Sequence, residues 1–95
     1  MHKPLHPGEF ITEVYLSFHS VSQRELARHL DVSLSRLNRL LHGLGTVNAD
    51  MALRLEKTLG RSAESWLAMQ RNHGLWRARR RVNLSRVSKL ELRAA

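Results

Sequence analysis

The sequence has no cysteine, only two prolines and few aromatic residues. Without cysteine, the chain can form no disulfide, no thiolate metal site and no thiol nucleophile. No apolar run approaches the roughly 20 residues that a membrane-spanning helix needs. The first residues, Met1–Pro4, lack the apolar core of a secretory signal. These absences lead us to expect a protein of the reducing cytoplasm that has no membrane partner.

Acidic residues are also scarce, and the imbalance is concentrated at one end of the chain. The 95 residues include 16 Lys and Arg against 8 Asp and Glu, which gives a formal net charge of +8. Residues 71–95 contribute +7 of this, from eight basic residues and one acidic residue, whereas residues 1–70 contribute only +1. A chain of this length forms one domain. The charged end is therefore typical of an appended arm that attracts a polyanion.

Apolar residues recur at three- and four-residue steps through most of the chain, which predicts helices rather than strands. Capping residues at the helix starts and glycine at two of the helix ends mark the boundaries. The predicted helices are Glu9–Phe18, Gln23–Leu30, Leu34–His42, Ala49–Leu59 and Ala63–Asn72. We expect His73-Gly74 to kink or stop the fifth helix, with residues 75–80 helical again.

The periodicity also predicts which side chains point inward. In the first helix the predicted apolar face consists of Phe10, Ile11, Val14, Tyr15 and Phe18. In the fifth helix it consists of Trp66, Leu67 and Met69. Residues 82–90 fit two patterns, because Val82 and Leu84 alternate as in a strand while Val87 and Leu90 are three apart as in a helix.

The second and third predicted helices have the spacing of a helix-turn-helix motif. Within Gln23–His42, the small residue Ala27 stands where two crossing helices come closest. The positions that lock such helices together are all apolar: Leu26, Leu30, Val32, Leu37 and Leu40. The turn position, which is usually glycine, is Asp31, a residue that tolerates a left-handed backbone better than most.

The outward side of the third helix is short, polar and basic. We expect it to contact DNA through Ser33, Leu34, Ser35, Arg36, Asn38, Arg39 and His42. Arginine pairs with two atoms of guanine and asparagine with two atoms of adenine, so Arg36, Arg39 and Asn38 suit base recognition. Gln23, at the start of the second helix, suits a backbone phosphate. The alternative for these residues is an ordinary solvated helix face.

Several further segments follow one another in a consistent order. They are His6–Glu9, Val21–Ala27, Val32-Ser33, Leu41–Gly43, Asn48–Leu55 and Leu59–Gln70. Together they resemble the HigA-type antitoxins of the lambda-repressor-like (Xre) helix-turn-helix family. The resemblance covers about residues 6–78 and implies an all-α, five-helix, lambda-repressor-like domain. We accordingly expect a DNA-binding antitoxin domain at 1–78 and a basic C-terminal tail at 79–95.

The resemblance implies a bacterial, nucleoid-associated protein with two kinds of partner. One is a HigB-like toxin, a messenger RNase of the RelE fold, which the antitoxin binds and neutralises. The other is double-stranded DNA, a palindromic operator at which a homodimer represses its own operon. Two alternatives stay open: a stand-alone Xre-type transcriptional regulator without a toxin, and a protein that mainly neutralises the toxin. The family often carries basic residues after Gly43, where this chain has Leu44-Gly45.

The last part of the chain offers candidates for further contacts. Trp66, Leu75 and Trp76 are candidates for a dimer or toxin interface, although Trp66 is also expected to fill the core between the first, fourth and fifth helices. Candidates for phosphate contacts are Arg77, Arg79, Arg80 and Arg81. The alternative for these arginines is a solvated arm.

The sequence contains no recognisable catalytic arrangement, so we expect no enzyme. It has no glycine-rich phosphate loop and no Ser-His-Asp pattern. Its six histidines have no cysteine partners, and they are expected to be surface or capping residues. We therefore expect neither a metal nor a cofactor.

Overall fold

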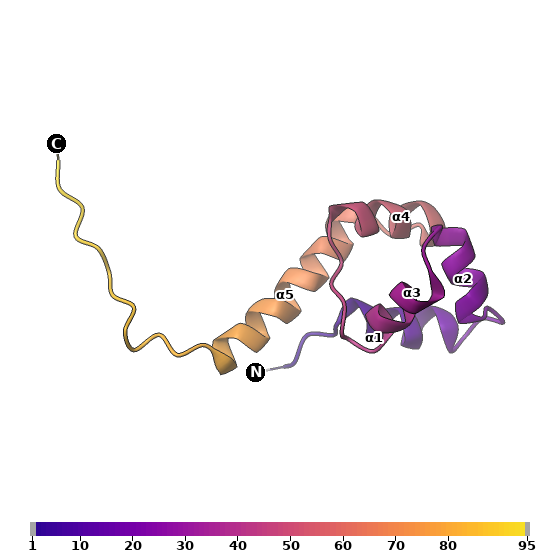
Figure 1. The fold of residues 1–95 in the computed structure, drawn as a ribbon, viewed down its shortest axis with the longest axis horizontal. Helices are drawn as coiled ribbons and strands as arrows, with labels where there is room; N and C mark the ends of the chain where they lie inside the picture. The colour runs from indigo at the N-terminus through magenta and orange to yellow at the C-terminus, as the bar shows by residue number, and fades with distance from the viewer. Residues whose placement is uncertain (1, 95) are drawn as a thin grey trace.

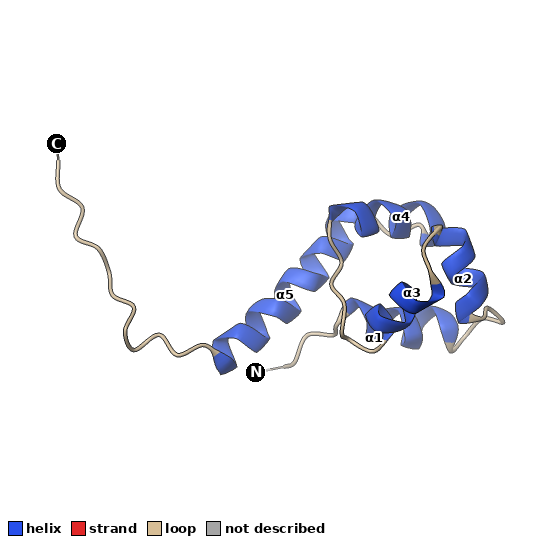
Figure 2. Ribbon diagram, viewed as in Figure 1, coloured by secondary structure: helices blue, strands red, loops and turns tan. Residues whose placement is uncertain are grey.

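The computed structural model describes residues 2–94 and is entirely helical in that range apart from loops and turns. The elements are α1 (Pro7–Phe10), which continues directly into the π-helix η1 (Ile11–Leu16), then α2 (Gln23–Leu30), α3 (Leu34–Leu41), α4 (Ala49–Leu59) and α5 (Ala63–Arg81). Figures 1 and 2 show α1 to α4 gathered around a common centre, with α5 leading away from them. The predicted all-α fold is confirmed.

The first helix differs from its prediction because it changes type. It starts at Pro7 rather than Glu9, and its second half has the wider π-helical turn, closed by a hydrogen bond from Ser17 N to Thr12 O of 2.9 Å. A π-turn takes more residues than an α-turn, so side chains rotate away from the positions that a 3.6-residue period assigns. Val14 is 39% exposed and Phe18 is 80% exposed, so the prediction that both are buried is wrong.

The helix-turn-helix forms with the predicted boundaries of α2. Ser22 Oγ accepts a hydrogen bond from Glu25 N, and Ser33 Oγ accepts one from Arg36 N, each at 3.0 Å. Asp31 adopts φ 56° and ψ 47°, the left-handed conformation that the turn requires. α3 ends at Leu41, one residue earlier than predicted, with His42 as its C-cap. The capping pattern in the sequence therefore located the motif.

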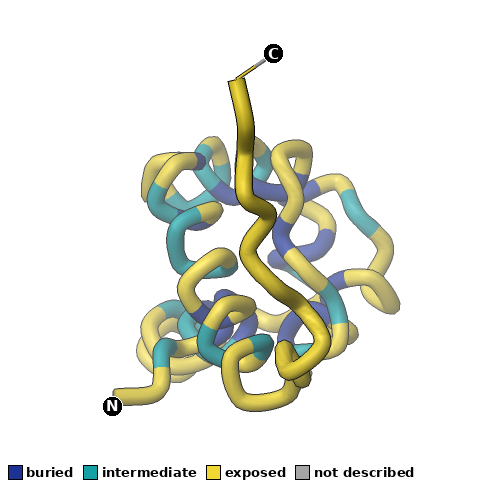
Figure 3. The backbone as a smooth tube through the Cα atoms, turned by 90° about the vertical axis from the view of Figure 1, so that its left-hand side faces the viewer, coloured by how far each residue is buried: buried dark blue, intermediate teal, exposed yellow. Residues whose placement is uncertain are grey.

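The fifth helix is longer than predicted, and it neither kinks nor stops at His73-Gly74. His73 is only 6% exposed and its ring meets the ring of His6 edge-on, with centroids 5.0 Å apart. This contact favours continuation of the helix, and α5 runs to Arg81, past the expected domain boundary at residue 78. Residues 82–94 form neither the strand nor the helix that their sequence allowed. Figure 3 shows this segment exposed along its length.

The core lies between the helix-turn-helix and the start of α5. Trp66 has no exposed surface, and its ring lies 5.7 Å from that of Phe10 and 6.4 Å from that of Tyr15. Its expected role as a core residue is confirmed. The neighbouring Leu67 is 36% exposed, so its predicted burial is wrong. The other fully buried apolar side chains include Ile11, Leu30, Leu37, Met51 and Leu55.

The start of the chain is attached to the loop after α3 through one histidine. His6 is the N-cap of α1: its Nδ1 accepts a hydrogen bond from Gly8 N at 2.9 Å. Its Nε2 lies 3.0 Å from Gly45 O and donates to that carbonyl. Both ring nitrogens are thus used by the neutral imidazole. Among the described residues, no helix has the length and apolarity to cross a bilayer.

Two glycines provide a matched test of backbone packing. A Cβ at Gly8 would meet Leu40 C at 2.8 Å and Leu41 Cα at 2.9 Å, whereas a Cβ at Gly74 would meet nothing within 4 Å. We expect Gly8→Ala to lower the free energy of unfolding by about 1–3 kcal/mol, as overpacking does. Gly74→Ala, in the middle of α5, should raise it by about 0.4–1 kcal/mol. Urea unfolding of both variants measures the difference, and equal effects would contradict the packing of α1 on α3.

Two buried histidines make stability depend on pH. Burial lowers the pKa of His6 and of His73, and nearby positive charge, including that of Arg77, lowers both further. As the pH falls, these histidines take up protons in the unfolded chain before they do so in the folded one. Their contribution to the free energy of unfolding is therefore complete above about pH 6.5 and decreases below it. The urea midpoint should decrease between about pH 7.5 and about pH 5.5.

Substitution distinguishes the contribution of the buried cluster, His6 and His73, from that of the other histidines. His73→Gln removes one of the two buried imidazoles, so it should reduce the pH dependence of the urea midpoint. His19→Gln, which changes an exposed histidine outside the cluster, is the matched control. The cluster is not the source of the pH dependence if the two variants show the same curve.

Candidate nucleic-acid interface

The residues predicted to contact DNA lie together on the exposed side of the helix-turn-helix. The inward side of α3 is buried through Leu37, Leu40 and Leu41. The remaining predicted residues are all exposed: Gln23, Ser33, Leu34, Ser35, Arg36, Asn38, Arg39 and His42. α3 therefore presents a polar and basic surface, and an apolar side chain, Leu34, is available at its start for a thymine methyl group.

A hydrogen bond joins the two helices of the motif on this surface. Asn38 Nδ2 donates to Gln23 Oε1 at 3.3 Å, although the residues are fifteen positions apart. The amide of Asn38 is thereby oriented from the start of α2. His42 Nδ1 lies 2.8 Å from Asn38 O, so it donates there and leaves its other ring nitrogen toward solvent. These side chains are held in place before any ligand arrives, which lowers the entropic cost of binding.

The two arginines of α3 have different surroundings. Arg36 Nη2 lies 3.8 Å from Asp50 Oδ1, at the start of α4. Arg39 forms no ion pair within residues 2–94. Because the Arg36 pair is exposed, it is weak and can exchange for a phosphate or a base. Arg39 carries the charge that is immediately available on this surface.

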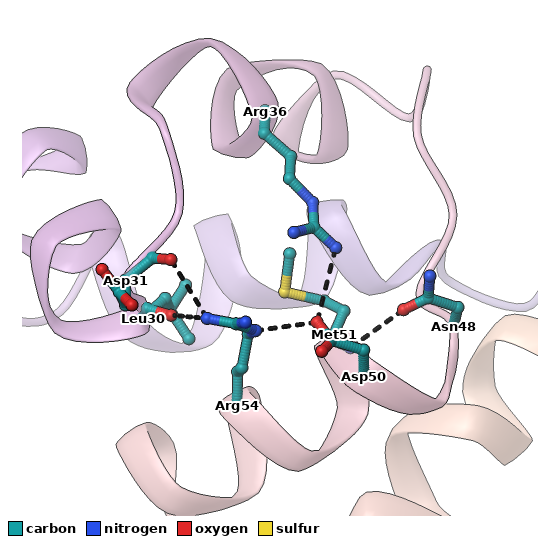
Figure 4. A network of polar contacts seen from close by, with 7 residues as sticks. All are labelled: Leu30, Asp31, Arg36, Asn48, Asp50, Met51 and Arg54. Atoms are coloured by element: carbon teal, nitrogen blue, oxygen red, sulfur yellow. Dashed lines mark hydrogen bonds and ion pairs between the residues drawn. The ribbon is translucent and has the colours of Figure 1, made fainter.

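Arg54 holds the turn between α2 and α3, and sequence reasoning missed it. One of its guanidinium nitrogens donates to Leu30 O and to Asp31 O, each at 3.0 Å. Its Nε donates to Asp50 Oδ1 at 2.7 Å, so one side chain of α4 binds the turn and the acid that faces Arg36 (Figure 4). This hydrogen bond is the main reason why the pKa of Asp50 lies below its ordinary value. The four-residue spacing of Asp50 and Arg54 was the available signal.

The arginines at the end of α5 point in different directions. Arg77 lines a pocket with His42 and Gly43, next to the end of α3. Arg80 lies over the Trp76 ring at 5.1 Å, and Arg79 lines another pocket with Leu75.

The interface candidates of α5 are also separated. Trp66 is fully buried, so its proposed interface role is corrected: it is a core residue only. Leu75 is 44% exposed. Trp76 is half-buried between two cations, Arg80 and Lys3, the latter with its Nζ 5.6 Å from the ring centroid. In the described part of the chain, no three side chains of the metal-binding types cluster.

Comparison with known proteins places the motif in a family. A family model described as helix-turn-helix matches residues 19–66. Virulence-associated protein I of Dichelobacter nodosus is 42% identical over 71 residues, which cover 75% of this chain and 66% of that protein. The uncharacterised HTH-type transcriptional regulator YddM of Escherichia coli is 36% identical over 84 residues, 88% of each chain.

Solved structures agree with this family. The antitoxin GraA is 33% identical with a TM-score of 0.85, and the alignment covers 97% of this chain and 99% of that one. The antitoxin HigA of Pseudomonas aeruginosa, solved with higBA promoter DNA, is 35% identical with a TM-score of 0.75 over 79% of this chain and 82% of that one. The family comprises DNA-binding antitoxins and regulators rather than enzymes. The chain therefore belongs to the lambda-repressor-like (Xre) helix-turn-helix family, and within it resembles the HigA-type antitoxins.

Proposed function

We propose that the protein is the antitoxin of a type II toxin–antitoxin pair that represses its own operon. The observation that carries the DNA-binding half is the exposed outward side of α3, which carries Arg36, Asn38 and Arg39, while Arg54 of α4 binds the turn that precedes this helix. α3 enters the major groove and these side chains meet base edges. Ser33 and Ser35, at the N-terminus of α3, and Gln23, at that of α2, meet phosphates.

A dimer would give this interface its length. Two copies related by a two-fold axis place two recognition helices about 34–36 Å apart, one turn of DNA, which suits a palindromic operator. The end of α5 is strongly basic, and Arg77 lies next to the end of α3, where its positive charge attracts DNA.

The toxin-binding half of the proposal rests on two observations. The chain resembles antitoxins over nearly its full length. It also exposes apolar surface at Leu75, next to the half-buried Trp76, on the part of α5 that projects beyond the core. An aromatic side chain beside an exposed apolar one is typical of a protein interface. We assign this surface to the second subunit or to a HigB-like messenger RNase.

A stand-alone transcriptional regulator is the second candidate. A relative aligned over 88% of its length is described as an HTH-type transcriptional regulator, with no toxin in its name. The exposed surface of α3 serves this function equally well. The two candidates differ only in whether a toxin partner exists.

Substitution of the recognition arginines tests the DNA interface. We expect Arg39→Ala and Arg36→Ala each to weaken binding to the DNA upstream of this gene by about 1–3 kcal/mol, as loss of a base contact does. The effect should be larger for Arg39 because Asp50 already holds Arg36. Gel-shift titration measures both. Lys57→Ala removes a similar charge from the last turn of α4 and should leave binding unchanged. Normal binding by both arginine variants would rule out α3 as the recognition helix.

Co-expression tests the toxin partner. An antitoxin is expected to restore growth when a neighbouring RelE-like reading frame is expressed, and to co-purify with its product. Leu75→Asp should abolish co-purification if this surface binds the toxin, because a buried, unpaired carboxylate is costly. Gln23→Ala, on the DNA side, is the control that should retain the complex. The stand-alone regulator is favoured if no neighbouring product binds the wild-type chain.

A further inference from the structure

The loop that follows the recognition helix has no charge of its own. Gly43, Leu44, Gly45 and Thr46 connect α3 to Val47, and none of them is basic. The loop is bound to α3, because Leu44 N and Gly45 N donate to Arg39 O at 2.9 Å and 3.3 Å. When α3 lies in the major groove, the segments at its ends approach the sugar-phosphate backbone. A positively charged contact to phosphate at this place therefore has to come from another part of the chain.

α5 lies beside this loop. Val47 N donates to Gln70 Oε1 at 2.8 Å, which fixes the end of the loop to the middle of α5. Farther along α5, Arg77 and Arg81 line one pocket with the loop residues Gly43–Thr46. Arg77 and Arg81 are four residues apart, so they project from the same face of the helix. Figure 1 shows α5 passing the α3–α4 connection before it leads away from the domain.

A second pocket connects this basic face with the recognition surface. It is lined by Lys3, His42, His73 and Arg77, among others, so the last residue of the recognition surface shares it with Arg77. The one carboxylate that lines it belongs to Glu9, which already accepts a hydrogen bond from His6 N at 3.3 Å. Positive charge from the N-terminal segment and from α5 thus meets at the end of α3.

The other two arginines of the run face elsewhere. Arg79 and Arg80 line a separate pocket with Pro4, Asn72, Leu75 and Trp76, and Arg80 is stacked on the Trp76 ring. The helix therefore divides one basic run into two sets. Arg77 and Arg81 face the loop after α3, and Arg79 and Arg80 face the exposed apolar surface.

We propose that Arg77 and Arg81 form a phosphate-binding surface continuous with α3. Its ligand is the phosphodiester backbone of double-stranded DNA next to the bases that α3 contacts. It supplies the charge that the α3–α4 loop lacks, and it acts on any sequence because phosphates carry no sequence information. This inference rests on the proposed DNA-binding function, but it concerns affinity and salt dependence rather than base recognition.

The salt dependence of binding tests this division of the run. The logarithm of the DNA association constant falls linearly with the logarithm of the salt concentration, and each lost phosphate contact makes this slope less steep by about 0.9. Arg77→Ala with Arg81→Ala should therefore reduce the steepness by about two. The loss should be equal on the DNA upstream of this gene and on an unrelated duplex. Arg79→Ala with Arg80→Ala removes the same charge from the same helix and should leave the slope unchanged. Arg77→Lys with Arg81→Lys should restore the wild-type slope.

The possible outcomes separate this proposal from the proposed function. Circular dichroism melting of each variant confirms that it is folded. If both alanine pairs lower the slope equally, only general charge attraction is present and the phosphate-binding surface is ruled out. If neither pair changes the slope while the wild type binds the upstream DNA, the surface is again ruled out, but the DNA-binding function stands. If the wild type binds neither duplex at low salt, both proposals fail.

Discussion

The position of the recognition helix depends on a close contact between two backbones. Gly8 in α1 approaches Leu40 in α3 so closely that no side chain fits between them. Only glycine permits this distance. α1 is therefore seated directly behind α3, and the side chains on the far side of α3 are turned outward. His6 secures the arrangement, because its two ring nitrogens bind the start of α1 and the loop after α3 together.

A second attachment acts on the other side of the motif. Arg54 binds the two carbonyls at the end of α2, where Asp31 takes the left-handed conformation that reverses the chain. The same side chain holds Asp50, and Asp50 in turn faces Arg36. α4 thus fixes the turn and places a carboxylate opposite one of the base-contacting candidates. The surface of α3 is rigid because α1 supports it from behind and α4 supports it from the turn.

Local signals in the sequence were sufficient to predict the helix-turn-helix. Contacts between residues that are distant in the sequence could not be predicted from such signals. The capping residues Ser22 and Asn48 and the apolar spacing predicted the bounds of α2 and α4 correctly, since a cap acts over three residues. The same reasoning failed for η1, because a π-turn has no distinct pattern of apolar residues. It also failed at His73-Gly74, where glycine suggested a break but the burial of His73 against His6 favours a continuous helix. Arg54 was missed because its partners lie in another helix.

The positions of the helices show how the positive charge of the molecule is divided between α3 and α5. The recognition helix carries only two arginines, and Asp50 faces Arg36, so Arg39 is the one without an ion pair within residues 2–94. In the proposed function its role is base selection, which requires oriented side chains such as the Asn38 amide held by Gln23. Affinity for DNA comes mainly from phosphate neutralisation, which requires charge at the right place but no sequence information. The fold separates these tasks: α3 carries the oriented polar groups, and α5 brings Arg77 and Arg81 to the uncharged loop beside it. If both proposals hold, a change in operator sequence is accommodated on α3 alone, because the proposed phosphate-binding residues belong to a different helix.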